Sequence, residues 1–208
     1  MMRRKSWATL ALLVAAVPAL AACGDEGNDH ESMTGTDTPS RGDSSAGDST
    51  AEFNDADVEF ATGMIPHHQQ AVEMAALAET RAQSPEVKKL AADIKAAQDP
   101  EIQTMTGWLE SWGEPVPGSE HGGHDMSESM PESMPGMMTA DEMTELEGLS
   151  GAEFDQMFLT MMIEHHEGAV EMAQAEQTDG QFPDAIALAE EIETAQNKEI
   201  ATMRDLLK

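Results

Sequence analysis

The feature that most constrains the fold of this chain is an internal duplication. The segment Phe60–Ala75 returns as Phe158–Ala173, so the two copies are separated by 158 − 60 = 98 residues. At this offset, and without a gap, 25 of the 54 positions from Asp57 to Glu110 carry the same residue in the second copy. Such self-similarity indicates two copies of one supersecondary unit that bury their apolar faces against each other.

Each copy has the pattern of two helices joined by a short turn. Ala, Glu, Met and Gln dominate, and strand-forming runs are short. Asn54 or Asp55 is expected to cap the first helix, Ser84 the second, and Ser150 with Glu153 the third as a capping box. Short connections make neighbouring helices antiparallel. The sequence therefore predicts an all-α four-helix bundle made of two tandem helical hairpins, at residues 53–113 and 150–208.

The N-terminus has the pattern of a bacterial lipoprotein signal. A basic start, Arg3 to Lys5, is followed by a short apolar stretch from Leu10 to Leu20 and by small residues ahead of Cys23. We predict a signal peptide over residues 1–22, lipidation of Cys23 and a location on the extracytoplasmic face of the cell membrane. The alternative is ordinary cleavage after Ala22, which leaves a free thiol. Residues 23–52 are polar and predict a flexible tether.

The charge of the chain excludes some partners. Removal of the signal leaves 8 basic and 40 acidic residues, a formal charge of −32. Such a charge argues against binding to nucleic acid or to an anionic membrane surface. Cys23 is the only cysteine, so an internal disulfide and a thiolate metal site are also excluded. The expected partners are the membrane, through the lipid, and a metal ion; a protein partner is not identified.

Two histidines of each copy flank the apolar face of the first helix. An advance of about 100° per residue places His67 and His68 on either side of a face made of Phe, Met and Ala. On the second helix, Glu101 falls among apolar residues, where a carboxylate is costly unless a facing histidine pairs with it. The duplication therefore predicts two equivalent polar clusters. They comprise Met64, His67, His68, Glu101 and Met105 in the first copy and Met162, His165, His166, Glu199 and Met203 in the second.

These clusters have two interpretations. A buried His–Glu pair can hold helix register without a ligand, and methionines at helical spacing usually pack in a core. An adjacent histidine pair in both copies, beside Met and an inward Glu, favours a metal site instead. Neighbouring helical residues diverge by about 100°, so His67 and His68 are not expected to chelate one ion, whereas Met64 can converge with either. Pro66 stands where the second copy has Glu164, so the two clusters are expected to differ.

The linker between the copies, residues 114–149, is rich in methionine and histidine. Thioether and imidazole together favour Cu(I) over hard cations, and Ag(I) binds by the same chemistry. The alternative is a hinge whose methionines cover the bundle. The sequence favours a flexible copper trap formed by His121, His124, Met126, Met130 and Met134.

The repeated block Met-Ile-x-His-His-x-x-Ala-Val-Glu-Met-Ala resembles the domain of unknown function 305 family, a ferritin-like four-helix family of exported bacterial proteins. The resemblance covers the chain from about Phe53 to Lys208. It implies a ferritin-like helical bundle, and some members are linked to copper binding and copper tolerance. The residues typical of the family map onto Met64, His67, His68 and Met74 and onto Met162, His165, His166 and Met172.

Three functions are compatible with these observations. We expect a lipid-anchored protein that sequesters or transfers Cu(I) outside the membrane without catalysis. A metal-free structural or interaction module is the alternative. A ferritin-like redox enzyme is less well supported, because di-iron bundles usually need a carboxylate from each helix and two Glu-x-x-His motifs, and this sequence has no such motif.

Overall fold

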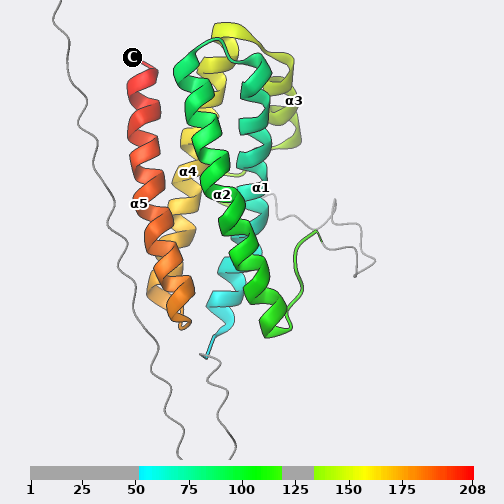
Figure 1. The fold of residues 1–208 in the computed structure, drawn as a ribbon, viewed down its shortest axis with the longest axis vertical. Coiled ribbons are helices and arrows are strands. Elements are labelled where there is room, and N and C mark those ends of the chain that lie inside the picture. The colour runs from blue at the N-terminus through cyan, green and yellow to red at the C-terminus, as the bar shows by residue number, and fades with distance from the viewer. Residues whose placement is uncertain (1–51, 119–133) are drawn as a thin grey trace, which may run out of the picture. The chain divides into compact units, whose positions relative to one another are not determined.

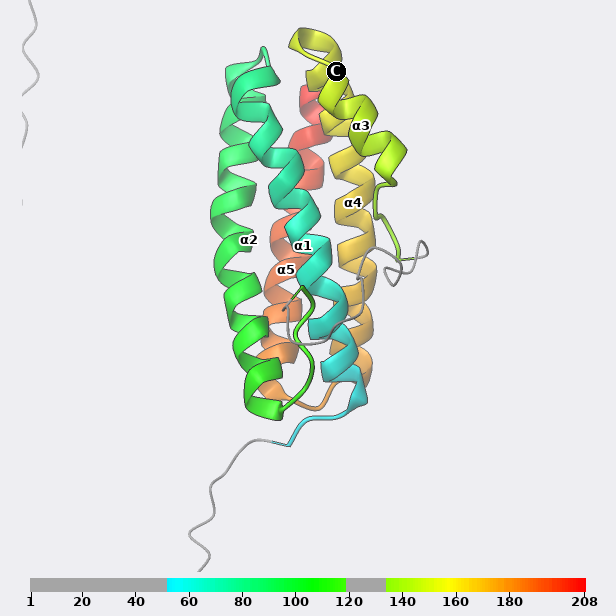
Figure 2. The ribbon, with the colours of Figure 1, turned by 90° about the vertical axis from the view of Figure 1, so that its right-hand side faces the viewer.

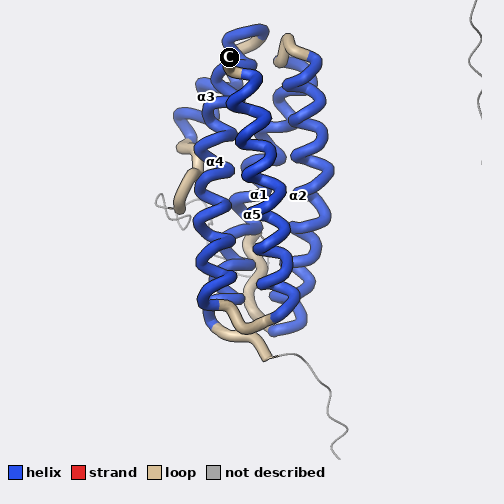
Figure 3. The backbone as a smooth tube through the Cα atoms, turned by 90° about the vertical axis from the view of Figure 1, so that its left-hand side faces the viewer, coloured by secondary structure: helices blue, strands red, loops and turns tan. Residues whose placement is uncertain are grey.

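The computed structural model describes residues 52–118 and 134–208, which form helices and connecting loops (Figure 1, Figure 3). The helices are α1 (Asp55–Arg81), α2 (Pro85–Trp112), α3 (Ala140–Gly148), α4 (Gly151–Asp179) and α5 (Pro183–Leu206). No strand occurs within these two ranges. The predicted all-α fold is confirmed, with α1 and α2 as the first hairpin and α4 and α5 as the second. No helix in the described ranges is long and apolar enough to cross a bilayer.

Side chains cap the two helices of the first hairpin as predicted. Asn54 accepts hydrogen bonds from the backbone N–H groups of Ala56 and Asp57, and the Asp57 carboxylate accepts one from the Asn54 N–H in return. The Ser84 hydroxyl accepts hydrogen bonds from the first-turn amides of α2, ahead of a proline at the first helical position. Each of these caps satisfies amides that the helix itself leaves without a partner.

The predicted capping box at the start of α4 is wrong. Ser150 precedes the helix, but its side chain makes no capping hydrogen bond, and Glu153 completes no box. The reason is Gly151, which has a φ of +71° and leads the chain into the helix through a left-handed conformation. Gly151 also forms an isolated backbone bridge with Ala82 at the end of α1. The chain direction at this point is therefore set by contact with the first hairpin rather than by a local cap.

α1 and α4 form the contact between the two hairpins. Each packs along its own partner, α1 on α2 and α4 on α5, and the two also pack against each other. α2 and α5 approach each other at few points, and Figure 2 shows α1 between α2 and α4. α1 and α4 are therefore the central pair of the bundle.

The buried apolar side chains form two clusters at opposite ends of the bundle. The cluster near the α1–α2 turn includes Met74, Ile94, Leu146, Phe154, Met162 and Met203. The cluster near the α4–α5 turn includes Phe60, Met64, Met105, Leu109, Ala173 and Ile192. The histidines of α1 and α4 lie between the two clusters along the chain, at the middle of the central helix pair.

An aspartate near the start of each hairpin holds the turn of the other hairpin. Asp57 on α1 accepts hydrogen bonds from the backbone N–H groups of Gln181 (3.1 Å) and Phe182 (2.8 Å) in the α4–α5 turn. Asp155, its counterpart on α4, accepts hydrogen bonds of 3.0 and 2.8 Å from the corresponding two amides of the α1–α2 turn. These reciprocal bonds follow the 98-residue offset, so an approximate twofold axis relates the copies.

Glu176 breaks this symmetry, because the first copy has Ala78 at the equivalent position. The Glu176 side chain is buried, with 2 % of its surface exposed. Burial, followed by contact with Asp57, raises the pKa of Glu176 to about 8. Burial acts to raise the pKa of Asp57 as well, but its backbone hydrogen bonds outweigh this effect and the pKa is lowered. At pH 7 Glu176 is therefore the protonated member of a buried carboxyl pair.

Glu176→Gln should change how stability depends on pH. Glutamate in the unfolded chain ionises near pH 4.5, whereas the folded protein keeps this proton to about pH 8. The contribution of Glu176 to stability is therefore fully present below about pH 4.5 and is lost as the pH rises through 8. We expect urea unfolding to show that the free energy of unfolding of the wild type falls between these pH values, and that it falls less in Glu176→Gln. Glu171→Gln, at an exposed position of the same helix, is the control; parallel profiles for all three proteins would contradict the prediction.

The predicted linker contains a helix that was not anticipated. α3 lies within residues 114–149, begins with a capping box of Thr139 and Glu142, and packs on α4. Residues 134–138, named the strap from here on, precede α3 and lie against α4 (Figure 2). Residues 1–51 and 119–133 lie outside the described residues.

Candidate metal centre

Four histidines from the central helices gather at the middle of the bundle. His67 and His68 on α1 and His165 and His166 on α4 each expose 1 % or less of their surface. The ring centroids of His67 and His165 are 3.8 Å apart with an interplanar angle of 47°, and those of His165 and His166 are 6.4 Å apart. The sequence predicted a separate cluster in each copy. The structure instead joins the copies, because His67 and His165 meet across the α1–α4 contact.

The outer histidine of each pair bonds to the inward glutamate that the sequence singled out. His68 Nε2 lies 2.6 Å from Glu101 Oε2, and His166 Nε2 lies 2.7 Å from Glu199 Oε2. Both glutamate side chains are one-fifth exposed, at 20 %, while both imidazoles are fully buried. The carboxylates therefore keep contact with solvent on one side and accept from a buried ring on the other, which lowers the cost of placing them among apolar residues.

These hydrogen bonds determine which ring nitrogen carries a lone pair. An ionised carboxylate only accepts, so Nε2 of His68 and of His166 is the donor, and in a neutral imidazole Nδ1 is then unprotonated. Nδ1 of both rings is buried and has no hydrogen-bond partner in residues 52–118 and 134–208. A histidine that donates from one nitrogen to a carboxylate and presents the other as a lone pair has the arrangement found in metal ligands.

In His67, too, Nε2 is the donor and Nδ1 carries the lone pair, but the acceptor is different. Its Nε2 lies 3.0 Å from the carbonyl oxygen of Pro135 in the strap, and a carbonyl accepts only. Its Nδ1 is therefore a buried lone pair, without a partner in the described part of the chain. His165, the counterpart of His67, has neither ring nitrogen paired among the same residues. The copies thus differ as expected, but the cause is the strap on one side of the bundle; a kink at Pro66 is not needed to explain it.

The strap is held at one position of the repeat, which is occupied by different residues in the two copies. Gln70 on α1 donates to the Met138 carbonyl oxygen (2.9 Å) and accepts from the Met138 N–H (2.7 Å). Its counterpart on α4 is Gly168, where a Cβ atom would lie 2.0 Å from the Pro135 oxygen. Gly136 has a φ of +75° and packs on the same helix. Sequence reasoning missed these residues, although the Gln–Gly difference within the repeated block was the available signal.

Burial keeps the central imidazoles neutral. Loss of water lowers the pKa of His67 to about 4, against the smaller effect of the Pro135 hydrogen bond, and the neighbouring His68 and His166 add to the lowering. The pKa of His165 falls well below its usual value, first because of burial and then because of His67 and His166. Both rings are therefore neutral at pH 7, and each can offer the lone pair of one nitrogen without first losing a proton.

The four methionines predicted to join the histidines are all buried but lie in the apolar clusters. Met64 and Met105 belong to the cluster near the α4–α5 turn, and Met162 and Met203 belong to the other one. The histidine layer is thus flanked by thioether-containing clusters at both ends. Of the predicted linker ligands, the structure describes Met134, which lies in the strap. His121, His124, Met126 and Met130, like the predicted lipidation site Cys23, lie outside the described residues.

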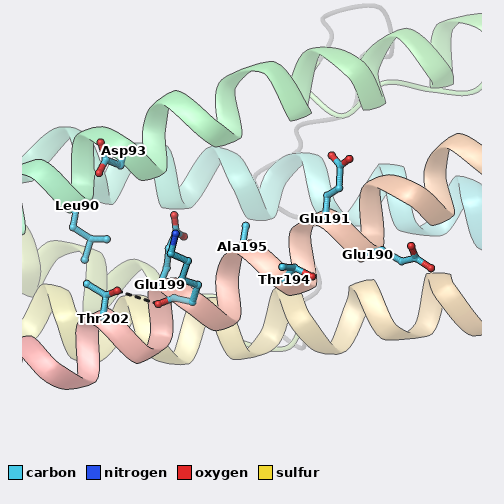
Figure 4. A pocket seen from close by; sticks show the side chains of 9 residues that line it. Leu90, Asp93, Glu190, Glu191, Thr194, Ala195, Glu199 and Thr202 are labelled. Carbon is cyan, nitrogen blue, oxygen red and sulfur yellow. Dashed lines mark hydrogen bonds between the residues drawn. The ribbon is translucent and has the colours of Figure 1, made fainter.

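A groove runs between α2 and α5, two helices that contact each other at few points (Figure 4). Acidic side chains from both helices line it, including Asp93, Glu190, Glu191 and Glu199. Because Glu199 also bonds His166, the groove brings solvent and negative potential to the outer side of one His–Glu pair.

The donor set favours some metals over others. In the described ranges no three histidine, cysteine, aspartate or glutamate side chains converge as a metal site would require. A closed zinc site or a carboxylate-bridged di-iron site, each built from such ligands, is therefore not preformed there. Buried neutral imidazoles with thioethers at both ends suit a soft ion that accepts few ligands, which is the coordination chemistry of Cu(I) and Ag(I).

Comparison with known proteins places the chain in a family. The profile of DUF305, a domain of unknown function, matches residues 57–207. This chain belongs to the DUF305 family. A DUF305 protein from Streptomyces coelicolor, described as a candidate secreted protein, has a crystal structure that is 38 % identical, with a TM-score of 0.64. The alignment covers 73 % of this chain and 91 % of that one.

Two further proteins are similar to this DUF305 protein. CopM in its Cu(I)-bound form is 33 % identical, with a TM-score of 0.58, and the alignment covers 72 % of this chain and 94 % of CopM. CopM has also been solved in silver-bound and Cu(II)-bound forms. Protein L153 of Acanthamoeba polyphaga mimivirus is 39 % identical over 54 residues, which are 26 % of this chain and 36 % of that protein.

Proposed function

We propose that this DUF305 protein binds Cu(I) through His67 and His165 and sequesters or transfers the ion without catalysing a reaction. The observation that carries the proposal is the set of buried imidazole nitrogens that have no hydrogen-bond partner in the described residues. A buried polar atom left unpaired costs about 1–3 kcal/mol. A bound soft cation would remove this cost, and the copper-bound and silver-bound forms of CopM support the choice of ion.

The remaining parts of the chain have supporting roles in the proposal. His121, His124, Met126, Met130 and Met134 act as a trap that collects copper. Lipid on Cys23 holds the protein at the extracytoplasmic face of the membrane. The signal pattern of residues 1–22 supports this location, as does the description of the Streptomyces coelicolor relative.

An anaerobic titration with Cu(I), in competition with a chromophoric chelator, tests the proposal on the full chain. Histidine labelled with ¹⁵N reports on each ring nitrogen during the same titration. We expect the Nδ1 resonance of His67 and a ring-nitrogen resonance of His165 to move with the first tightly bound ion, while Nε2 of His68 and His166 stays protonated by its link to glutamate. Copper uptake that leaves all four histidine spectra unchanged would refute the proposal and would assign the His–Glu pairs a structural role.

A further inference from the structure

Two further thioethers line a cavity beside the histidine layer. The cavity, about 390 Å³ in volume, lies between the N-terminal half of α1 and the C-terminal half of α4. Met134 and Pro135 of the strap line it, and so does Met172 on α4. Both methionine side chains are half-buried, and Met172 also packs against the apolar cluster near the α4–α5 turn.

The two methionines converge on Gly63 of α1. A Cβ atom at Gly63 would lie 2.9 Å from Met172 Cε and 3.7 Å from Met134 Sδ, so both side chains lie over the bare backbone of this glycine. The second copy has Met161 at the equivalent position, and that side chain is buried. The residue equivalent to Met172 in the other copy is Met74 on α1, which is fully buried. The open space with two accessible thioethers is therefore a feature of one side of the bundle.

The surroundings of this pair favour a soft cation. Glu59 and Asp179 also line the cavity and bring negative charge to it. Carboxylates raise the local concentration of cations of any kind. Thioether sulfur then selects among them, because it binds Cu(I) and Ag(I) and is a poor ligand for hard cations such as Mg²⁺ and Ca²⁺.

The cavity is also next to His67. Gly63 precedes His67 by four residues on α1, which is one helical turn, or about 6 Å along the helix. Met134 is bonded directly to Pro135, whose carbonyl oxygen accepts the hydrogen bond from His67. The strap therefore carries a thioether at the cavity and the anchor of a buried imidazole on consecutive residues.

We propose that Met134 and Met172 form a separate Cu(I) capture site, from which the ion passes to His67 and His165. The second step rests on the proposed function, whereas the capture site does not. The ion keeps its +1 charge throughout, because thioether sulfur is exchanged for imidazole nitrogen and no electron is transferred. No proton is released, since Nδ1 of His67 already holds a lone pair.

Methyl NMR of the full chain with ¹³C-labelled methionine tests the capture site, with Ag(I) as a redox-inert probe. We expect the ε-methyl resonances of Met134 and Met172 to move with the first ions added. A variant that lacks the core ligands, His67→Gln/His165→Gln, should show the same shifts. Met134→Leu/Met172→Leu keeps side-chain volume and removes both sulfurs. It should slow the loading of the histidines by Ag(I) relative to wild type. The matched control is Met143→Leu/Met157→Leu, because both residues pack on the other apolar cluster, away from the cavity.

The outcomes separate this proposal from the proposed function. Methyl resonances of Met134 and Met172 that stay unchanged would overturn the capture site, whatever the histidines do. Methyl shifts without any histidine response would support the capture site and refute copper binding at the histidine core. Loading rates that are equal in Met134→Leu/Met172→Leu and in the control would overturn the transfer step.

Discussion

His67→Gln/His165→Gln should weaken the tight binding of Cu(I) at least about 100-fold. Loss of a group that merely orients a metal ligand costs about 10–100-fold in affinity, and removal of both ligands costs more. Glutamine keeps a polar side chain of moderate size but offers no imidazole lone pair. The chelator competition titration should therefore lose its tight phase, while any weaker binding by linker methionines remains.

The matched control for this prediction is Glu190→Gln/Glu191→Gln. It changes the same number of side chains and removes two charges from the groove between α2 and α5, but it leaves the histidine layer intact. We expect its tight phase to equal that of wild type. Circular dichroism should show the same helix content in all three proteins. A tight phase that survives in His67→Gln/His165→Gln would place the copper site elsewhere in the chain.

Gly168→Ala should destabilise the protein by about 3 kcal/mol, at the upper end of the usual cost of overpacking. The new methyl group would lie 2.0 Å from the Pro135 oxygen and 2.7 Å from the Gly136 nitrogen, and both atoms belong to the backbone. A side chain could turn away from such a contact, but a backbone segment has to move as a unit. The strap would separate from α4, and His67 would lose its acceptor.

Gly107→Ala is the matched control, since Gly107 is exposed within α2 and a Cβ atom there meets no atom within 4 Å. Alanine should stabilise this helix by about 0.5–1 kcal/mol. Urea unfolding measures both changes, which are expected to have opposite signs. Equal and small effects at the two glycines would mean that the strap does not pack on α4 in solution.

Much of the fold could be predicted from the duplication and from local helix signals. Ser84 and Asn54 act as caps because a cap depends on a few consecutive residues. Ser150 does not, because Gly151 adjusts the chain to a contact with the end of α1, nearly 70 residues earlier. Helical periodicity also predicted that Glu101 points inward and pairs with a histidine of the facing helix. It could not identify His68 as that histidine, because His67 and His68 flank the same face.

The centre of the site could not be predicted from one copy at a time. Whether His67 meets His68, Glu101 or His165 depends on how α1 packs on α4, and no local pattern encodes that contact. The strap was also missed, because Pro135 lies far from His67 in the sequence. The differences between the copies were the unused signal. Gly63 against Met161, Gln70 against Gly168, and Ala78 against Glu176 mark the cavity, the strap and the buried carboxyl pair.

The reciprocal bonds of Asp57 and Asp155 have a consequence for the history of such a chain. A single hairpin could bury its apolar face by pairing with a second molecule of itself, and its aspartate would then hold the turn of that molecule. In such a symmetric dimer the two central imidazoles would be identical. Fusion into one chain allowed a connecting segment to cover one side only, which anchors His67 and leaves His165 unanchored. Duplication thereby converts two identical histidine positions into two that differ, so that under the proposed function the two ligands of the ion would not be equivalent.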